Sequence, residues 1–241
     1  MSSELHETPP TPREVRTVFA GLMLALALAS LDQNIVAVAL PQIVSELGGL
    51  HHLSWVVTSF LVTSTATTPL YGKLSDMYGR KPLFIIAIGI FLIGSCLCGL
   101  SRSMTQLVVF RGIQGMGAGG LMVLAQTTIA DLVAPRERGR YQGLFGAVFA
   151  FSSIAGPLLG GFITSAFSWR WIFYVNVPVG IPALAMIAFG FRRPHHKVPH
   201  RIDYAAVALL SSATVALLLV LSWGGVQYLS RQSRNVLLLA K

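Results

Sequence analysis

The chain has 241 residues, of which 54% are hydrophobic and 11% are charged. A soluble domain carries about 25% charged residues, so this chain cannot cover a water-facing surface and most of its outside must face lipid. The formal net charge of +9 does not indicate nucleic-acid binding, because the basic residues lie in short loops between apolar runs and form no stripe on one soluble face.

Apolar runs long enough to cross a bilayer, about 20 residues at about 1.5 Å each, recur along the chain. They predict membrane spans over residues 17–40, 53–72, 83–100, 105–129, 141–164, 171–191 and 204–225. The first six form a bundle over 17–191, and the seventh follows it. The sequence therefore predicts an all-α membrane protein.

The segments outside these spans are short. Residues 1–16 are interpreted as a flexible cytoplasmic tail and 192–203 as a basic cytoplasmic loop. Residues 226–241 contain a last apolar piece that begins a helix with no room to continue. We therefore interpret 226–241 as the tail of a truncated protein, with an eighth helix and all that follows it missing.

Lysine and arginine fall almost entirely on one side of the predicted membrane. With the N-terminus inside, 12 of them lie in cytoplasmic segments and 2 lie in the opposite loops of the first six spans. The cytoplasmic residues are Arg13, Arg16, Lys73, Arg80, Lys81, Arg136, Arg138, Arg140, Arg192, Arg193, Lys197 and Arg201. The opposite residues are Arg102 and Arg170. The positive-inside rule therefore places the N-terminus in the cytoplasm.

Two ionisable residues lie inside predicted spans: Asp32 in the first and Arg111 in the fourth. Burying such a charge costs roughly 2.5–3.5 kcal/mol or more, which makes each a functional candidate. At about 1.5 Å per residue, Asp32 lies roughly 23 Å above the inner face. Arg111 lies roughly 6 Å below the outer face of a hydrocarbon core about 30 Å thick. Both estimates fall at nearly the same height, so the two side chains can form a pair.

Such a pair suits proton coupling, because burial favours the protonated form of a carboxyl and a neighbouring cation favours the charged form. Helix movement can then switch the acid between the two states. Two structural interpretations remain open: a fixed ion pair that only locks two helices together, or an arginine that snorkels to the interface.

Three amide side chains lie near the predicted pair. Gln33 and Asn34 directly follow Asp32, and Gln114 lies one helical turn after Arg111. They are candidates for lining a substrate cavity, and hydrogen bonding between helices is the alternative. We predict no metal site: Cys96 and Cys98 point to opposite sides of one helix.

The loop between the second and third spans resembles the loop signature of the major facilitator superfamily, a glycine and an acid followed by Gly-Arg-Lys. The residues that carry the resemblance are Gly72, Asp76, Gly79, Arg80 and Lys81. The sequence from Arg111 to Gly119 is similar to the second family signature, whose arginine is implicated in proton coupling. The resemblance implies that the loop is a gating latch which stabilises the outward-facing state.

The fifth predicted span resembles the antiporter signature of the same superfamily, which is associated with export. Its matching residues are Gly143, Gly156, Pro157, Gly160 and Gly161. Ser152 stands where that pattern usually has glycine.

The stretches 31–41 and 169–178 are similar to those of the fourteen-helix drug:proton antiporter branch. The resemblance implies that the six helices are two inverted three-helix repeats, with substrate bound between this bundle and a second one.

The resemblance implies a proton-coupled exporter of drugs or other hydrophobic or cationic small molecules in the plasma (cell inner) membrane. Its expected partners are a small-molecule substrate, protons, the lipid bilayer and the missing C-terminal half. The proton gradient would supply the energy and no cofactor is expected. Two alternatives stay open: an exporter of a metabolite such as an amino acid or siderophore, and an inactive half-transporter that needs a second half. An intramembrane enzyme is not expected, because the spans contain a single acid and no histidine.

Overall fold

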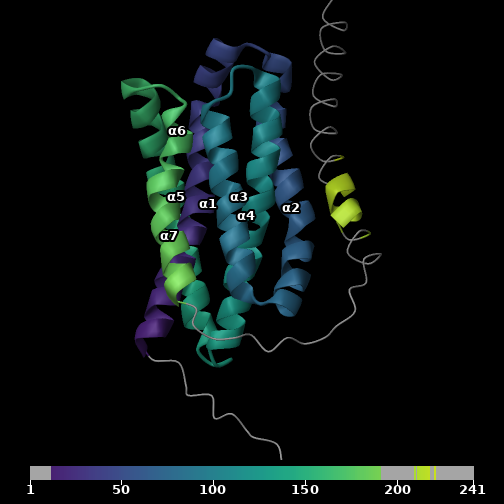
Figure 1. Cartoon of the computed structure of the whole chain (residues 1–241). Helices are drawn as coiled ribbons and strands as arrows, with labels where there is room; N and C mark the ends of the chain where they lie inside the picture. The colour runs from purple at the N-terminus through teal and green to yellow at the C-terminus, as the bar shows by residue number, and fades with distance from the viewer. Residues whose placement is uncertain (1–11, 191–208, 210, 218–219, 221–241) are drawn as a thin grey trace, which may run out of the picture.

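The computed structural model of the chain describes residues 12–190, 209, 211–217 and 220, and Figure 1 shows its arrangement. The described elements are α1 (Pro12–Leu47), the short 3-10 turn η1 (Leu50–His52), α2 (Leu53–Tyr78), α3 (Arg80–Gly99), α4 (Met104–Leu132), α5 (Arg138–Ala166), α6 (Trp171–Tyr174) and α7 (Asn176–Gly190). Within the described residues the fold is all-α, as predicted.

The helices differ from the predicted spans at two places. α1 begins at Pro12, inside the stretch 1–16 that we interpreted as a flexible tail. Proline suits the first position of a helix, because the amide N–H that it lacks would have no partner there. The sixth span extends over Trp171–Gly190, close to the predicted 171–191, but a turn at Val175 divides it into α6 and α7.

Most of the chain beyond α7 lies outside the described residues. This holds for the predicted basic loop 192–203, for the predicted tail 226–241 and for most of the predicted seventh span 204–225. In that span the described residues, 209, 211–217 and 220, are helical. The Ser211 hydroxyl donates a hydrogen bond to the Ala66 carbonyl of α2 at 3.0 Å.

Five of the described helical segments are long and apolar enough to cross a membrane: Arg16–Leu47, Arg80–Gly99, Met104–Leu132, Arg138–Ala166 and Trp171–Gly190. The predicted span 53–72 is not among them, although α2 runs beside the other long helices over the height of the bundle (Figure 1). Serine and threonine are frequent in α2, which lowers its mean hydropathy without changing its length.

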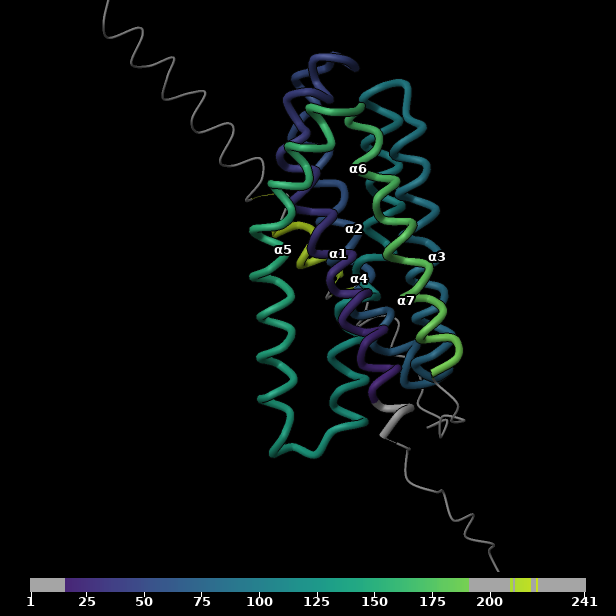
Figure 2. Tube along the Cα trace, turned by 90° about the vertical axis from the view of Figure 1, so that its left-hand side faces the viewer, coloured from purple at the N-terminus to yellow at the C-terminus, as the bar shows by residue number. Residues whose placement is uncertain are grey.

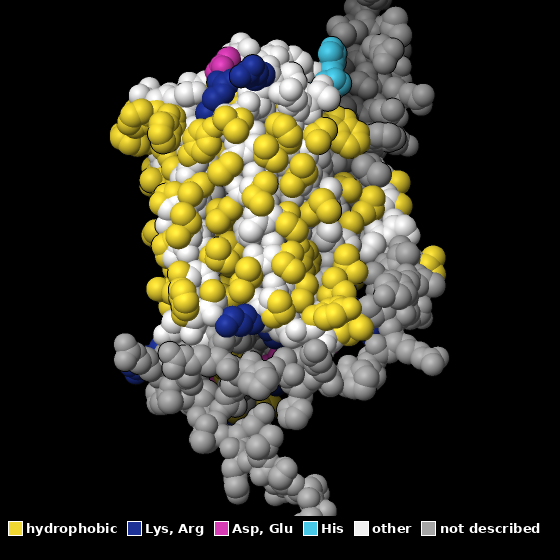
Figure 3. All heavy atoms as spheres, viewed as in Figure 1, with side chains coloured by type: hydrophobic (Ala, Val, Ile, Leu, Met, Phe, Trp, Pro, Cys, Tyr) yellow, Lys and Arg dark blue, Asp and Glu magenta, His cyan; other side chains and the backbone are white. Residues whose placement is uncertain are grey.

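The packing places α4 at the centre of one group of helices and α1 at the centre of another. α4 packs mainly against α2 and α3, and α1 packs mainly against α5 and α7. Figure 2 shows α5 standing beside α1 at the edge of the bundle. On the flank seen in Figure 3, hydrophobic side chains cover the surface between charged groups at the two ends. This is the surface expected of a protein embedded in a bilayer.

Glycines let α4 approach both of its neighbours closely. A Cβ atom at Gly119 would lie 2.2 Å from the Ser64 carbonyl oxygen of α2, and one at Gly117 would lie 2.5 Å from the Phe91 backbone nitrogen of α3. Because backbone atoms cannot move aside without displacing a whole helix, these two positions exclude any side chain. The small-residue pattern thus brings helix backbones into contact.

We predict that Gly119→Ala destabilises the full-length protein by about 1–3 kcal/mol, because overpacking forces α2 and α4 apart. The measurement is thermal unfolding of the purified protein in detergent. The matched control is Gly89→Ala in α3, where a Cβ meets nothing within 4 Å. If Gly119→Ala unfolds at the same temperature as Gly89→Ala, the close approach of α2 and α4 is wrong.

Candidate functional site

The centre of the bundle holds an ion pair between α1 and α4. Asp32 and Arg111 are 0% and 1% exposed, and Arg111 Nη1 donates a hydrogen bond to Asp32 Oδ2 at 2.6 Å. The two residues therefore lie at one height, as their helix positions predicted. The burial of Arg111 rules out the interpretation that it snorkels to the membrane interface.

Two amide groups complete the coordination of the carboxylate. Gln114 Nε2 donates to Asp32 Oδ1 at 2.8 Å, and Asn176 Nδ2 donates to the same oxygen at 2.7 Å. Arg111 Nη1 also donates to Gln114 Oε1 at 2.8 Å, which holds that amide in place. The carboxylate thus accepts three hydrogen bonds from side chains of α4 and α7. Asp32 and its three donors are all buried.

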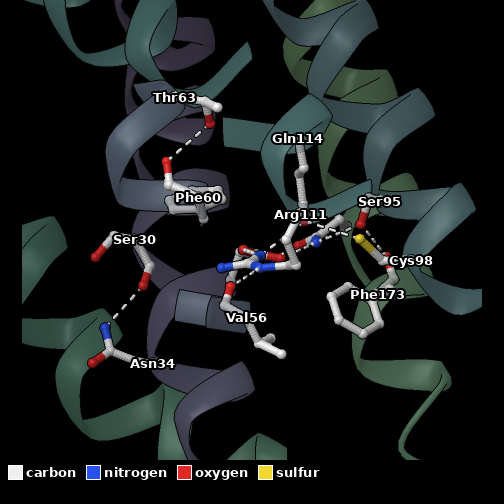
Figure 4. A network of polar contacts seen from close by, with 12 residues as sticks. Ser30, Asn34, Val56, Phe60, Thr63, Ser95, Cys98, Arg111, Gln114 and Phe173 are labelled. Carbon is white, nitrogen blue, oxygen red and sulfur yellow. Dashed lines mark hydrogen bonds and ion pairs between the residues drawn. The ribbon is translucent and has the colours of Figure 1, made fainter. Parts of the chain in front are cut away.

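The guanidinium is held on its other side by α2. Arg111 Nε donates to the Val56 carbonyl at 3.3 Å, and its central carbon lies 4.1 Å from the centroid of the Phe60 ring. Figure 4 shows Val56 and Phe60 of α2 around the Arg111 head group. An aromatic face attracts a desolvated cation, so α2 supplies both a hydrogen-bond acceptor and a cation–π contact.

Two further residues extend the network, and sequence reasoning did not assign them. Asn176 is the first residue of α7, and Ser95 of α3 accepts a hydrogen bond from Asn176 Nδ2 at 2.8 Å. Both are buried. A signal existed for Asn176, because it is a polar residue inside a predicted span, and such residues usually face the bundle interior. Ser95 carried no comparable signal, since serine is common in helix contacts.

The other two predicted cavity residues do not join this network. Gln33 is exposed on the bundle surface. Asn34 is half-buried, and its amide donates to the Ser30 carbonyl of its own helix at 2.8 Å, apart from Arg111 (Figure 4). Successive helical residues point about 100° apart, so neighbours of Asp32 in sequence cannot share its direction. Substrate contact by Gln33, Asn34 or Gln114 stays a prediction.

At the predicted gating loop, Arg80 is the central residue. Its Nη1 contacts Asp76 Oδ1 at 2.7 Å and also Ser75 Oγ, and its Nε contacts Asp131 Oδ2 at 2.9 Å. Asp131 lies at the end of α4 and was not assigned from sequence. Gly79 joins α2 to α3 with φ 95° and ψ 156°, a conformation that favours glycine. The loop is thus tied to α4 as well as to α2.

Two further loop residues were predicted on the basis of the signature. A Cβ at Gly72 would lie 3.7 Å from Val123 Cγ2, which is ordinary contact distance. Alanine would therefore fit at this position. Lys81 is half-buried in the first turn of α3. The latch role of the loop stays a prediction.

In α5, two of the signature residues lie close against α1. A Cβ at Gly156 would lie 2.4 Å from Asn34 Cβ, and one at Gly160 would lie 3.0 Å from the Ile35 carbonyl oxygen. For Gly143 and Gly161 the added atom meets nothing within 4 Å. Pro157 is exposed, and α5 continues through it. Gly156 and Gly160 therefore serve the contact between α1 and α5.

Comparison with known proteins identifies the family of this bundle. The family model described as Major Facilitator Superfamily matches residues 22–237. The chain belongs to the major facilitator superfamily. This family consists of multi-pass membrane transporters, not enzymes.

Two relatives and one solved structure show how this major facilitator chain compares with longer proteins. Multidrug resistance protein 3 of Bacillus subtilis (strain 168) is 43% identical over 220 residues, which cover 90% of this chain and 43% of that protein. The MFS-type efflux pump LUC4 of Fusarium sp is 39% identical over 217 residues, which cover 88% and 38%. The chain thus spans less than half the length of these relatives.

The structure of the human organic anion transporter MFSD10 (TETRAN) has the same fold as this chain. It superposes with a TM-score of 0.70 at 21% identity, over 85% of this chain and 55% of that one. At this identity the likeness extends to the fold alone.

We predict that Asp32→Leu lowers the stability of the full-length protein by about 3–5 kcal/mol, because it leaves Arg111 as an unpaired buried cation. The double variant Asp32→Leu/Arg111→Leu removes both charges and should recover most of that loss. Thermal unfolding in detergent compares the two. A direct pair would be contradicted if the double variant lost as much stability as Asp32→Leu and Arg111→Leu lose together.

Proposed function

We propose that the full-length transporter containing this chain exports hydrophobic or cationic small molecules in exchange for protons. The observation that carries the proposal is the carboxylate of Asp32, which is fully buried and held by Arg111, Gln114 and Asn176. A group that can bind one proton at the centre of a helix bundle suits a coupling site. The relatives named as a multidrug resistance protein and an efflux pump support export.

Proton coupling follows from the charges of the pair. With Asp32 ionised, its negative charge balances the Arg111 cation, and their hydrogen bond at 2.6 Å joins α1 to α4. A proton on Asp32 removes that negative charge, which weakens the charge-assisted bond and leaves Arg111 as an excess cation. The helices are then free to change their contacts. Protonation from outside and release to the inside would drive the exchange.

The route of the substrate requires parts beyond the bundle described here. We propose that a C-terminal half completes the cavity, and that the two bundles rock about it in alternating access. The excess of lysine and arginine in the predicted cytoplasmic segments supports an N-terminus inside the cell. We assign the protein to the plasma membrane, because an exporter acts at the boundary of the cell. The relative named as a multidrug resistance protein favours drugs over a metabolite.

We predict that Asp32→Asn abolishes proton-driven efflux while downhill exchange of substrate continues. Asparagine has the shape of aspartate and its oxygen can still accept from Arg111, but the side chain cannot carry a proton. The full-length protein is reconstituted in liposomes, and efflux of ethidium is followed after a pH gradient is imposed. Exchange of labelled against unlabelled ethidium without a gradient measures the transport step alone.

The matched control is Glu137→Gln, which makes the same change at an exposed acid before α5. It should transport like the unchanged protein. Unchanged proton-driven efflux in Asp32→Asn would remove Asp32 from the mechanism. Competition of ethidium efflux by amino acids or siderophores, but not by cationic drugs, would favour a metabolite exporter.

A further inference from the structure

Within the sixth membrane span, Trp171–Gly190, a one-residue break at Val175 separates α6 from α7 close to Asp32, and proline explains it. α6 ends at Tyr174 and α7 begins at Asn176. Pro178 has no amide N–H to donate to the carbonyl of Tyr174, and its ring collides with that carbonyl in a regular helix. Backbone groups freed at such a break need new partners, and neighbouring helices and Ser or Thr side chains commonly supply them in membrane proteins.

Side chains on both sides of the break connect it to Asp32. The Ser95 hydroxyl of α3 donates to the Phe173 carbonyl in α6 at 2.8 Å, and it accepts from Asn176 Nδ2 at 2.8 Å. The same amide nitrogen donates to Asp32 Oδ1 at 2.7 Å. An amide NH2 group has two N–H donors, so Asn176 can donate one hydrogen bond to the carboxylate and the other to the Ser95 hydroxyl.

α3 packs closely against both halves of the broken span, which keeps this arrangement in register. A Cβ at Gly99 would lie 2.6 Å from the ring of Tyr174 in α6, and a Cβ at Gly180 of α7 would lie 2.5 Å from Leu92. Figure 4 shows Ser95 and Phe173 side by side near Cys98. The residues on both sides of the break are therefore packed tightly against α3, so that a movement of the Asn176 side chain affects their contacts.

We propose that Asn176 is a positioning residue that transmits the charge state of Asp32 to the break between α6 and α7, through the Ser95 hydroxyl and the Phe173 carbonyl. This inference rests on the proposed function of Asp32 in proton exchange. The inference adds a structural response to that function: the backbone hydrogen bonding of the sixth span changes when the Asp32 carboxyl gains or loses its proton.

The direction of the effect follows from hydrogen-bond chemistry. An ionised carboxylate accepts charge-assisted bonds, which are shorter and stronger than neutral ones. It therefore holds Asn176 firmly, and Asn176 in turn orients Ser95 toward Phe173. A neutral Asp32 loosens that hold, and Ser95 is then free to turn away from the Phe173 carbonyl.

The environment of Asp32 is consistent with a single charge switch. Among the described residues, Arg111 of α4 is the charged group that faces it. The titratable neighbour is Cys98 of α3, whose thiol donates to Gln114 Oε1 at 3.7 Å. The groups that α2 and α7 bring to the pair, Val56 and Phe60 from the first and Asn176 from the second, carry no charge.

The test is hydrogen–deuterium exchange of the full-length transporter in nanodiscs, compared at acidic and alkaline pH. In the unchanged protein, backbone amides of the segment 171–178 should exchange faster at acidic pH, after correction for the intrinsic pH dependence. Asp32→Asn should lose this pH response. Asn176→Leu and Ser95→Ala should lose it as well, although both keep Asp32.

Matched variants separate transmission from simple loss of packing. Ser152→Ala makes the same change as Ser95→Ala at a buried serine whose hydroxyl has no hydrogen-bond partner among the described residues, and it should keep the pH response. Ser95→Thr retains the hydroxyl and should restore the response. If Asn176→Leu fails to fold, Ser95→Ala and Ser95→Thr carry the same test.

Efflux measurements add a second readout. Asn176→Leu removes a donor to the carboxylate, so the pH midpoint of proton-driven efflux should move to higher pH. A normal pH response of 171–178 in Asn176→Leu or Ser95→Ala, with the response lost in Asp32→Asn, would overturn the inference and leave the proposed function standing. Full proton-driven efflux in Asp32→Asn would overturn both.

Discussion

The structure is organised around one buried negative charge. A carboxylate deep in a bilayer-embedded bundle is stable only if a cation and hydrogen-bond donors replace its water. Here one guanidinium and two amides do so, and they come from α4 and α7, while the carboxylate itself belongs to α1. α2 and α3 contact the same group of side chains from outside. These polar contacts therefore fix the heights of α1, α4 and α7 relative to one another. Apolar packing alone is less directional.

Close backbone packing is what lets short side chains reach this centre. A Cβ at Gly94 of α3 would lie 2.6 Å from Gln114 Cα, and a Cβ at Gly115 of α4 would lie 2.4 Å from the Phe60 carbonyl oxygen. Both glycines lie beside residues that bind the ion pair. With larger residues at these positions, α2, α3 and α4 would stand farther apart. The amide of Gln114 and the ring of Phe60 would then miss their partners, so the glycine pattern and the polar network depend on each other.

The sequence allowed the ion pair to be anticipated because helix rise is constant. Counting residues from the membrane faces put Asp32 and Arg111 at one height, and Gln114 follows Arg111 by about one turn. The same count places Asn176, about five residues into the predicted span 171–191, near that height. It does not reveal the link from Asn176 to Ser95, because serine is common in helix contacts. The serines and threonines of α2 lower its mean hydropathy, so that it is not among the segments apolar enough to span a membrane. It nevertheless packs as a long helix of the bundle.

Polar contacts at the two ends of the bundle differ from those at its centre. At one end Glu46 accepts from Trp169 Nε1 at 2.7 Å and pairs with Arg170, and at the other Arg80 pairs with Asp76 and Asp131. The acids in these pairs are about half exposed and the arginines are 11% and 29% exposed, so both end pairs are more accessible to water than the central one. Breaking either end therefore costs less than separating the helices at the centre, because separation there exposes or strands a fully buried charge. A bundle built in this way can rearrange its ends more easily than its middle.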